Sequence, residues 1–267
     1  MAFPPSPLSE LARAIAEARA TNQTIPPPPA ALTMDEAYAV QSESLRLREA
    51  AVAGYKIGLT NPAAQRSMGT TEPILGRLCA ADILHGMATI PAGAQPRFAE
   101  AELVVEMGTD LSHSGAPIDE ARVAAAIGGV YAGIELCTSR YAVDDIDIGA
   151  LIADNGHAEW LVVGGRLSHG WDDRFATMEA CLLRDNAPPV VGNSASVLGN
   201  PLAAVTWLAN WLATRGEALR RGQLVATGSC TGITEIGRHD RITSRFAHGM
   251  EAHARIGTPT IKREREG

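Results

Sequence analysis

The chain has almost no lysine. Of its 23 basic residues only two, Lys56 and Lys262, are lysines, and the others are arginines. Lys262 belongs to the charged stretch 262–266, which leaves Lys56 as the one lysine in the body of the 267-residue chain, within the apolar, glycine-flanked run 54–60. A buried lysine can give up its proton near neutral pH, whereas arginine stays charged. The residue choice therefore indicates an amine for catalysis or substrate binding, although a lysine that extends from a strand into solvent fits the same run.

Other scarce features exclude several classes of protein. Aromatic residues make up 4% of the chain, its net charge is -7, and no basic stripe is present, so we expect no nucleic-acid partner. No apolar run approaches the length of a membrane helix, so we expect no membrane partner. The four cysteines form no Cys-x-x-Cys pair, and the N-terminal residues are proline-rich and polar, unlike a secretory signal. These features predict a cytoplasmic protein with reduced thiols.

The hydrophobic pattern changes near residue 53. Before it, helical spacing predicts helices over 8–20 and from a capping box at Thr33 and Glu36 to about residue 51. After it, short apolar runs separated by glycine, proline and aspartate predict strands. We therefore predict an α+β fold with a helical N-terminal region, residues 1–52, and a β-rich catalytic domain, residues 53–267. The predicted strands of this domain cover 54–59, 100–107, 128–137, 159–164 and 223–228, and its predicted helices cover 118–127 and 201–215, the latter capped by Asn200.

Two glutamates lie two positions apart on the predicted strand 100–107. Side chains at i and i+2 leave a strand on the same face, so Glu100 and Glu102 point the same way, about 7 Å apart. Glu106 shares their parity but is expected to lie beyond the site. A solvated strand face is the common explanation for such a pair. A hard divalent cation is the alternative, because Mg2+ takes carboxylate oxygens and keeps positions for water and substrate.

Glu135 is the only charged residue of the predicted strand 128–137. A lone carboxylate in a buried strand is costly without a partner. Arg140 is the structural candidate for that partner, and a metal ion shared with Glu100 and Glu102 is the functional candidate. Three carboxylates are enough to hold Mg2+ or Mn2+.

Two glycine-containing segments supply further candidates. Asp154 begins an Asp-Asn-Gly turn, and His157 after it is a candidate acid or base if the turn lines a pocket. The stretch 227–232, with Gly228 and Ser229, either presents backbone N–H groups to a substrate carboxylate or forms a tight turn.

The order of these motifs along the chain carries a family resemblance. The motifs are 32–41, 56–60, Met68-Gly69, 100–102, 133–135, Ser139-Arg140, Asp154-Asn155, 199–201 and 227–229. Over nearly the whole chain they resemble the 2-keto-4-pentenoate hydratase and 4-oxalocrotonate decarboxylase family of the fumarylacetoacetate hydrolase superfamily. The resemblance implies a mixed, sheet-rich core of the fumarylacetoacetate hydrolase C-terminal type and a homo-oligomer, with a complex with a paralogue of the same pathway as a further option.

The resemblance also implies roles for the candidate residues. Glu100, Glu102 and Glu135 bind Mg2+ or Mn2+, the metal holds a small 2-oxo acid substrate, and Lys56 transfers protons beside it. Among its apolar neighbours and near a cation, Lys56 is expected to have a lowered pKa. His157 is the second catalytic candidate. The expected substrate-binding residues are Leu59, Thr60, Asp154, Gly228 and Ser229.

The expected reaction is hydration. A metal-dependent hydratase would add water to a 2-hydroxy-2,4-dienoate of aromatic catabolism and give a 4-hydroxy-2-oxo acid. Two positions depart from the family pattern: Ile74 follows Pro73 where hydratases often have an aspartate, and His157 stands where a small or hydroxyl residue is usual. The alternatives are a decarboxylase of a 2-oxo dicarboxylate of the 4-oxalocrotonate type, another lyase or hydrolase of carbon–carbon bonds in the superfamily, and an inactive partner of an active paralogue.

Overall fold

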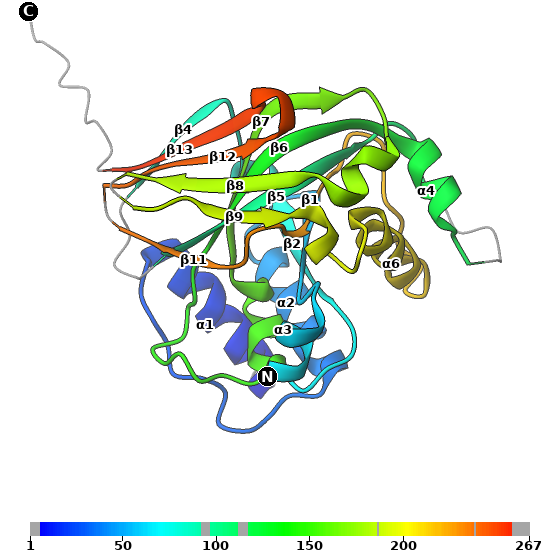
Figure 1. Ribbon diagram of the computed structural model, residues 1–267. Helices are drawn as coiled ribbons and strands as arrows, with labels where there is room; N and C mark the ends of the chain where they lie inside the picture. Colours follow the sequence, from blue (N-terminus) through cyan, green and yellow to red (C-terminus); the bar gives the residue numbers. More distant parts are fainter. Residues whose placement is uncertain (1–5, 92–96, 112–116, 186, 238, 258–267) are drawn as a thin grey trace, which may run out of the picture.

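Two β-sheets lie face to face in the computed structural model, which describes residues 6–91, 97–111, 117–185, 187–237 and 239–257 (Figure 1). In the view of Figure 1 one group of helices lies below the sheets and another lies at their right-hand side. The predicted α+β class with a mixed, sheet-rich core is confirmed.

The larger sheet contains every strand that the sequence predicted. Its order is β2-β1-β10-β5-β6-β7-β3, and β11 pairs with the first residues of β5. β10 comes from late in the chain, and it lies parallel to β1 and antiparallel to β5. The strands are β1 (Val52–Gly58), β2 (Ile74–Cys79), β3 (Ile83–His85), β5 (Arg97–Met107), β6 (Ile127–Cys137), β7 (Ala158–Ser168), β10 (Leu224–Ser229) and β11 (Thr234–Ile236).

A second, five-stranded sheet covers one face of the first within the described residues. Its order is β4-β13-β12-β8-β9. β12 and β13 pack against β5, β6 and β7, so Leu103 and Ile134 of the larger sheet share one buried cluster with Leu182 and Ile242 of the smaller. Each such side chain stabilises the fold by roughly 1.5–3 kcal/mol. The strands are β4 (Met87–Pro91), β8 (Glu179–Arg184), β9 (Val190–Asn193), β12 (Arg241–Phe246) and β13 (Glu251–Gly257).

The N-terminal helices pack on a short helix of the later chain. α1 (Pro7–Thr21) and α2 (Met34–Arg46) contact each other, and α2 contacts α5 (Ile148–Ala153). The predicted capping box forms, since the Thr33 side chain accepts from the Glu36 N–H and the Glu36 carboxylate accepts from the Thr33 N–H. α2 ends at Arg46 rather than near residue 51, and Glu49 beyond it adopts a φ of 52°.

The remaining helices border the sheets. They are α3 (Pro62–Ser67), α4 (Glu120–Ala126) and α6 (Pro201–Ala213). Asn200 caps α6 as predicted, because its side chain accepts from the Leu202 N–H. Among the residues that the structure describes, no helix has the length and hydrophobicity needed to span a membrane.

Candidate metal centre and active site

Strand pairing brings the three predicted glutamates together. β5 and β6 are antiparallel, and Glu100 stands directly opposite Glu135 in their register. Directly opposed side chains start about 5 Å apart. Glu102 is two residues further along the face of β5 that carries Glu100. A carboxylate oxygen of Glu100, one of Glu135 and the Cys137 sulfur all lie within 4.8 Å of one another.

Lys56 reaches this cluster from β1 and is the ion-pair partner of Glu135. Its Nζ lies 3.1 Å from Glu135 Oε1, and the whole residue is only 4% exposed. The alternative partner, Arg140, is engaged elsewhere, since its guanidinium pairs with Asp154 and Glu159. Lys56 is therefore neither on the surface nor extended into solvent.

The buried carboxylates fit a cation. Glu102 and Glu135 are each 1% exposed, and Glu102 Oε1 and Glu135 Oε2 have no hydrogen-bond donor within the described residues. Burial first, and then the charge of Glu135, raises the pKa of Glu100 and raises that of Glu102 well above its usual range. Buried like charges repel unless a positive group lies among them. Carboxylate oxygens are the ligands that Mg2+ and Mn2+ prefer.

The pKa of Lys56 differs from the lowered value that we expected from the sequence. Burial lowers the pKa of Lys56, but the carboxylate of Glu135 and the other acidic groups around it outweigh burial, and the net pKa lies above the ordinary value. With the charged groups of the protein alone around Lys56, the prediction of a lowered pKa is therefore wrong. A cation on the carboxylates would oppose their effect on Lys56.

Cys137 was not among the predicted site residues. Its thiol is buried and lies 3.8 Å from Glu100 Oε2. Burial, followed by the charge of Glu135, raises the pKa of this thiol, so Cys137 is a neutral donor. Cys137 lies two residues after Glu135 on β6 and therefore on the same face of the strand. This spacing is the feature of the sequence from which Cys137 could have been predicted.

The turn after α5 presents His157 to the site. Asn155, Gly156 and His157 form a short 3-10 segment with φ values near +60°. The turn is held because the Asn155 side chain exchanges two hydrogen bonds with the backbone of Arg77 in β2. Burial, and then the charge of Arg140, lowers the pKa of His157 to about 3, so the imidazole is neutral at physiological pH.

Asp154 does not reach the cavity. It is fully buried, accepts the Arg140 N–H at 2.9 Å and pairs with the Arg140 guanidinium. Its placement contradicts the expected direct contact with substrate, because the arginine already occupies its carboxylate. Asp154 instead lies 3.6 Å from His157 Nε2, beneath the turn.

The glycine-rich end of β10 supports a carboxylate of the cluster. The Gly228 N–H donates to Glu102 Oε2 at 2.9 Å. Gly228 has a φ of 122°, and a Cβ there would stand 2.4 Å from Thr60 Oγ1, so only glycine fits the close approach of β10 to the end of β1. Gly228 therefore contacts a proposed metal ligand rather than the open cavity.

A cavity of about 450 Å³ opens above the cluster. Ile74, which stands in place of the family's aspartate, forms part of its wall. The predicted site residues that line it are Lys56, Leu59, Thr60, Glu100, His157 and Ser229. Glu102 and Glu135 are not part of its described lining, and Glu135 contacts the lining residue Lys56.

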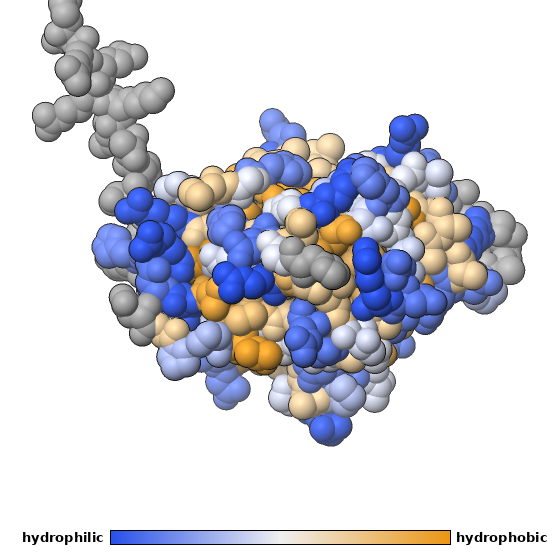
Figure 2. Space-filling view, turned by 45° about the horizontal axis from the view of Figure 1, so that its top comes forward, coloured by the Kyte–Doolittle hydropathy of each residue, from blue (hydrophilic) through white to orange (hydrophobic). Residues whose placement is uncertain are grey.

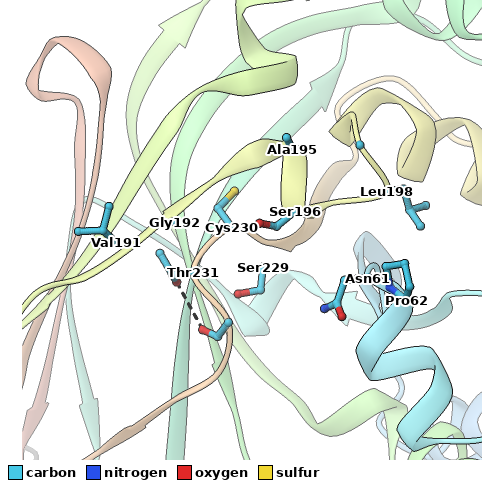
Figure 3. Close-up of a pocket in the computed structure, with 12 residues that line it drawn as sticks. Asn61, Pro62, Val191, Gly192, Ala195, Ser196, Leu198, Ser229, Cys230 and Thr231 are labelled. Carbon is cyan, nitrogen blue, oxygen red and sulfur yellow. Dashed lines mark hydrogen bonds between the residues drawn. The ribbon is translucent and has the colours of Figure 1, made fainter.

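A second cavity of about 650 Å³ adjoins the first and shares Asn61, Ser229 and Gly232 with it. Figure 3 shows this second cavity. The side chains of Ser229 and Asn61 lie between the strand that carries Val191 and the helix that begins at Pro62.

Comparisons with known proteins show the family to which the chain belongs. No protein-family model matches the chain. The 4-oxalocrotonate decarboxylase of Pseudomonas putida is 32% identical over 222 residues, 80% of this chain and 82% of the relative. The 2-keto-4-pentenoate hydratase of Burkholderia vietnamiensis is 33% identical over 235 residues, 83% of this chain and 87% of the relative.

Solved structures share the fold. The 4-oxalocrotonate decarboxylase from Pseudomonas putida G7, complexed with magnesium and adipate, matches with a TM-score of 0.83 at 30% identity and covers 93% of this chain and 96% of that chain. The same enzyme was solved with calcium and acetate. Fumarylpyruvate hydrolase from Pseudomonas aeruginosa, in complex with Mn2+ and pyruvate, matches with a TM-score of 0.55 at 16% identity, which indicates a common fold.

The two packed sheets therefore define a protein of the fumarylacetoacetate hydrolase superfamily. Within that superfamily, the chain belongs to the family of 2-keto-4-pentenoate hydratases and 4-oxalocrotonate decarboxylases, which are lyases. The predicted family is thus confirmed.

Proposed function

We propose that this protein is a metal-dependent hydratase that adds water to a 2-hydroxy-2,4-dienoate and yields a 4-hydroxy-2-oxo acid. The observation that carries the proposal is the approach of the Glu100 and Glu135 carboxylates to each other, with Lys56 paired to Glu135, beside a cavity of about 450 Å³ that Lys56 and Glu100 line. Cavities of roughly 300–1,000 Å³ are usual for small-molecule sites. The family relatives include enzymes named for this reaction.

Glu100, Glu102 and Glu135 would hold the cation, Mg2+ or Mn2+. When bound, such a cation neutralises the buried carboxylates and polarises the 2-oxo group of a substrate. The Gly228 N–H fixes one oxygen of Glu102 and leaves Oε1 for the cation. Cys137 lies beside Glu100, but a neutral thiol is a poor ligand for these hard cations.

Lys56 would move the proton. Its Nζ lies at the cavity floor, and Glu135 fixes its position at 3.1 Å. Ketonisation of the dienol and addition of water both require proton transfer to carbon beside this amine. Ser229 and Thr60 border the same space, and Leu59 supplies an apolar contact for the carbon chain. His157 is the alternative acid or base, although its lowered pKa leaves it neutral.

Decarboxylation of a 2-oxo dicarboxylate is the second candidate, and Ile74 favours it. The apolar Ile74 lines the cavity where an aspartate would help to position water, and it is 1% exposed. Both reactions pass through an enolate next to the 2-oxo group, so the same carboxylates and Lys56 serve either.

One experiment tests the proposal and separates the two candidates. The purified protein is incubated with Mg2+, or with EDTA, and either 2-hydroxypenta-2,4-dienoate or 4-oxalocrotonate. We expect Mg2+-dependent loss of the dienol absorbance, without release of CO2 from the first substrate. Release of CO2 from 4-oxalocrotonate alone would select the decarboxylase, and equal turnover in EDTA would overturn the metal-dependent mechanism.

The proposal includes a cytoplasmic location and a homo-oligomeric state. Cys79, Cys137, Cys181 and Cys230 are all free thiols, which fits a reducing compartment.

A further inference from the structure

Three potential metal ligands meet at the wall of the active-site cavity, and one of them is a sulfur. A carboxylate oxygen of Glu100, one of Glu135 and the Cys137 sulfur all lie within 4.8 Å of one another. Glu100 and Cys137 line the cavity, so an ion that enters the cavity can reach this group. Among the described residues the group does not include Glu102, one of whose oxygens accepts the Gly228 N–H.

The strand geometry fixes the sulfur beside the two carboxylates. Cys137 follows Glu135 by two residues on β6, and Glu100 stands opposite Glu135 in the register of β5 and β6. Cys137 Sγ lies 3.8 Å from Glu100 Oε2. A sulfur about 2.3 Å and an oxygen about 2.0 Å from one tetrahedral Zn2+ stand roughly 3.5 Å apart. The observed separation is therefore only slightly longer than the one that a shared ion requires.

Glu135 brings a buried oxygen without a hydrogen-bond donor to this group. Lys56 pairs with Glu135 Oε1 at 3.1 Å, whereas Oε2 has no donor within the described residues. A buried acceptor without a partner is costly. The third member of the group, Cys137, decides which ion fits, because thiolate sulfur selects borderline and soft cations such as Zn2+, whereas Mg2+ takes oxygen ligands.

We propose that Glu100, Glu135 and Cys137 form a site for a thiophilic divalent cation, of the class of Zn2+ and Co2+, and that this ion excludes Mg2+. The bond between the ion and sulfur forms as the thiol proton passes to solvent, with no change of oxidation state. Glu100 and Glu135 serve both ions, so only one ion is bound at a time. The sulfur site is independent of the reaction, and the exclusion of Mg2+ rests on the proposed function.

Co2+ reports sulfur ligation directly. It takes the same ligands as Zn2+, and a Co2+–thiolate bond gives a charge-transfer band in the near ultraviolet that an all-oxygen site lacks. Titration of the EDTA-treated wild type with Co2+ is expected to give this band, and stoichiometric Zn2+ is expected to remove it. A spectrum of oxygen ligation alone at saturation would overturn the proposal.

Cys137→Ser and Cys181→Ser form a matched pair. Cys181, on β8, is the one cysteine that is not buried, so it controls for adventitious binding to a thiol. Only Cys137→Ser is expected to abolish the band and to weaken Zn2+ binding at least about tenfold, since even the loss of an outer-shell partner costs that much. Mg2+ affinity is expected to stay within a few-fold in both variants. Equal spectra of the two variants would contradict the assignment.

Two further measurements cover the case in which Cys137→Ser does not fold. X-ray absorption of the wild type with one equivalent of Zn2+ is expected to show sulfur at about 2.3 Å together with oxygen at about 2.0 Å; a shell of oxygen alone would sink the idea. Glu100→Gln keeps all four thiols and is expected to weaken Co2+ binding at least about tenfold. Unchanged Co2+ binding in that variant would show that the sulfur acts without the carboxylates.

Turnover then separates this inference from the proposed function. Sulfur ligation of Co2+ without Mg2+-dependent turnover of either substrate would remove the proposed lyase reaction and keep the sulfur site. Mg2+-dependent turnover by a protein that binds Co2+ through oxygen alone would keep the reaction and remove the sulfur site. Equal Mg2+ affinity with and without one equivalent of Zn2+, measured by calorimetry, would remove the exclusion of Mg2+.

Discussion

At the scale of single residues, the ion pair between Lys56 and Glu135 is the centre of the site. The scarcity of lysine made Lys56 conspicuous, and the lone charge in an apolar strand did the same for Glu135. Their contact could not be predicted, because it depends on the insertion of β10 between β1 and β5. The position of Asp154 was predicted wrongly for a related reason, since its partner Arg140 is set by tertiary packing.

Lys56→Arg tests whether the site needs a proton or only a charge. Guanidinium does not give up its proton in proteins. General acid–base catalysis by a side chain typically raises the reaction rate about 100- to 10,000-fold. We expect turnover to fall by roughly that factor, while Mg2+ affinity and Tm stay close to wild type. Turnover within a few-fold of wild type would assign Lys56 a binding role and leave His157 as the acid or base.

Glu135→Gln tests the acidic cluster with an almost unchanged shape. It removes one of the three proposed ligand carboxylates, so we expect Mg2+ binding measured by calorimetry to weaken sharply and activity to fall with it. Glu106→Gln is the matched control. Glu106 lies on the same face of β5, but it contacts the Tyr131 hydroxyl and Arg166. Equal Mg2+ affinity in wild type and Glu135→Gln would argue against a three-glutamate site.

At the scale of elements, the strands that carry the site were predictable and the second sheet was not. β5 and β6 are long apolar strands whose few carboxylates stand out. In β12 the alternation of buried and exposed positions includes Ser244, which is fully buried, so the strand lacks a clear hydrophobic pattern. α5 has six residues, too few for a helical period to be recognised.

Gly76→Ala probes how closely the elements approach around Lys56. Gly76 is the register partner of Lys56 on β2, and a Cβ there would stand 2.4 Å from the Asn155 carbonyl oxygen and 2.9 Å from Lys56 Cγ. Overpacking of this kind costs about 1–3 kcal/mol. We expect a lower unfolding free energy and reduced turnover. Gly257→Ala is the control, since a Cβ at that position meets nothing within 4 Å; similar losses in both variants would contradict the packing argument.

At the scale of the whole molecule, we predict a dimer or a larger assembly built from dimers. Trp211 of α6 does not support this prediction, because it packs against Tyr38 and the Arg215 guanidinium within the chain. Apolar and hydrophilic side chains both reach the face shown in Figure 2.

The edges of the second sheet offer a stronger argument for assembly. Its edge strands β4 and β9 carry Met87 and Val191, which are 80% and 73% exposed, and exposed apolar residues on edge strands favour association. Light scattering at micromolar concentration is expected to give at least twice the chain mass of 28.1 kDa. A single 28.1 kDa species would remove the prediction.

The acidic cluster also makes the stability of the whole fold depend on Mg2+ and pH. Folding raises the pKa of Glu100 and Glu102. Their contribution to stability is therefore fully present below the pKa of an unfolded glutamate and is lost as pH rises through the raised values. A cation that binds the ionised carboxylates competes with protons, so its stabilising effect is larger where the protons are gone.

We accordingly expect Mg2+ to raise Tm more at pH 8 than at pH 5.5. A ligand at 100 times its Kd stabilises by about 2.7 kcal/mol, which for a chain of this size corresponds to a Tm increase of about 5 °C or more. Calorimetric scans with MgCl2, and with NaCl at matched ionic strength, separate binding from screening. EDTA should reverse the increase, and Glu135→Gln should abolish most of it. An equal increase at the two pH values, or one reproduced by NaCl, would show that the glutamate cluster does not bind the cation in its ionised form.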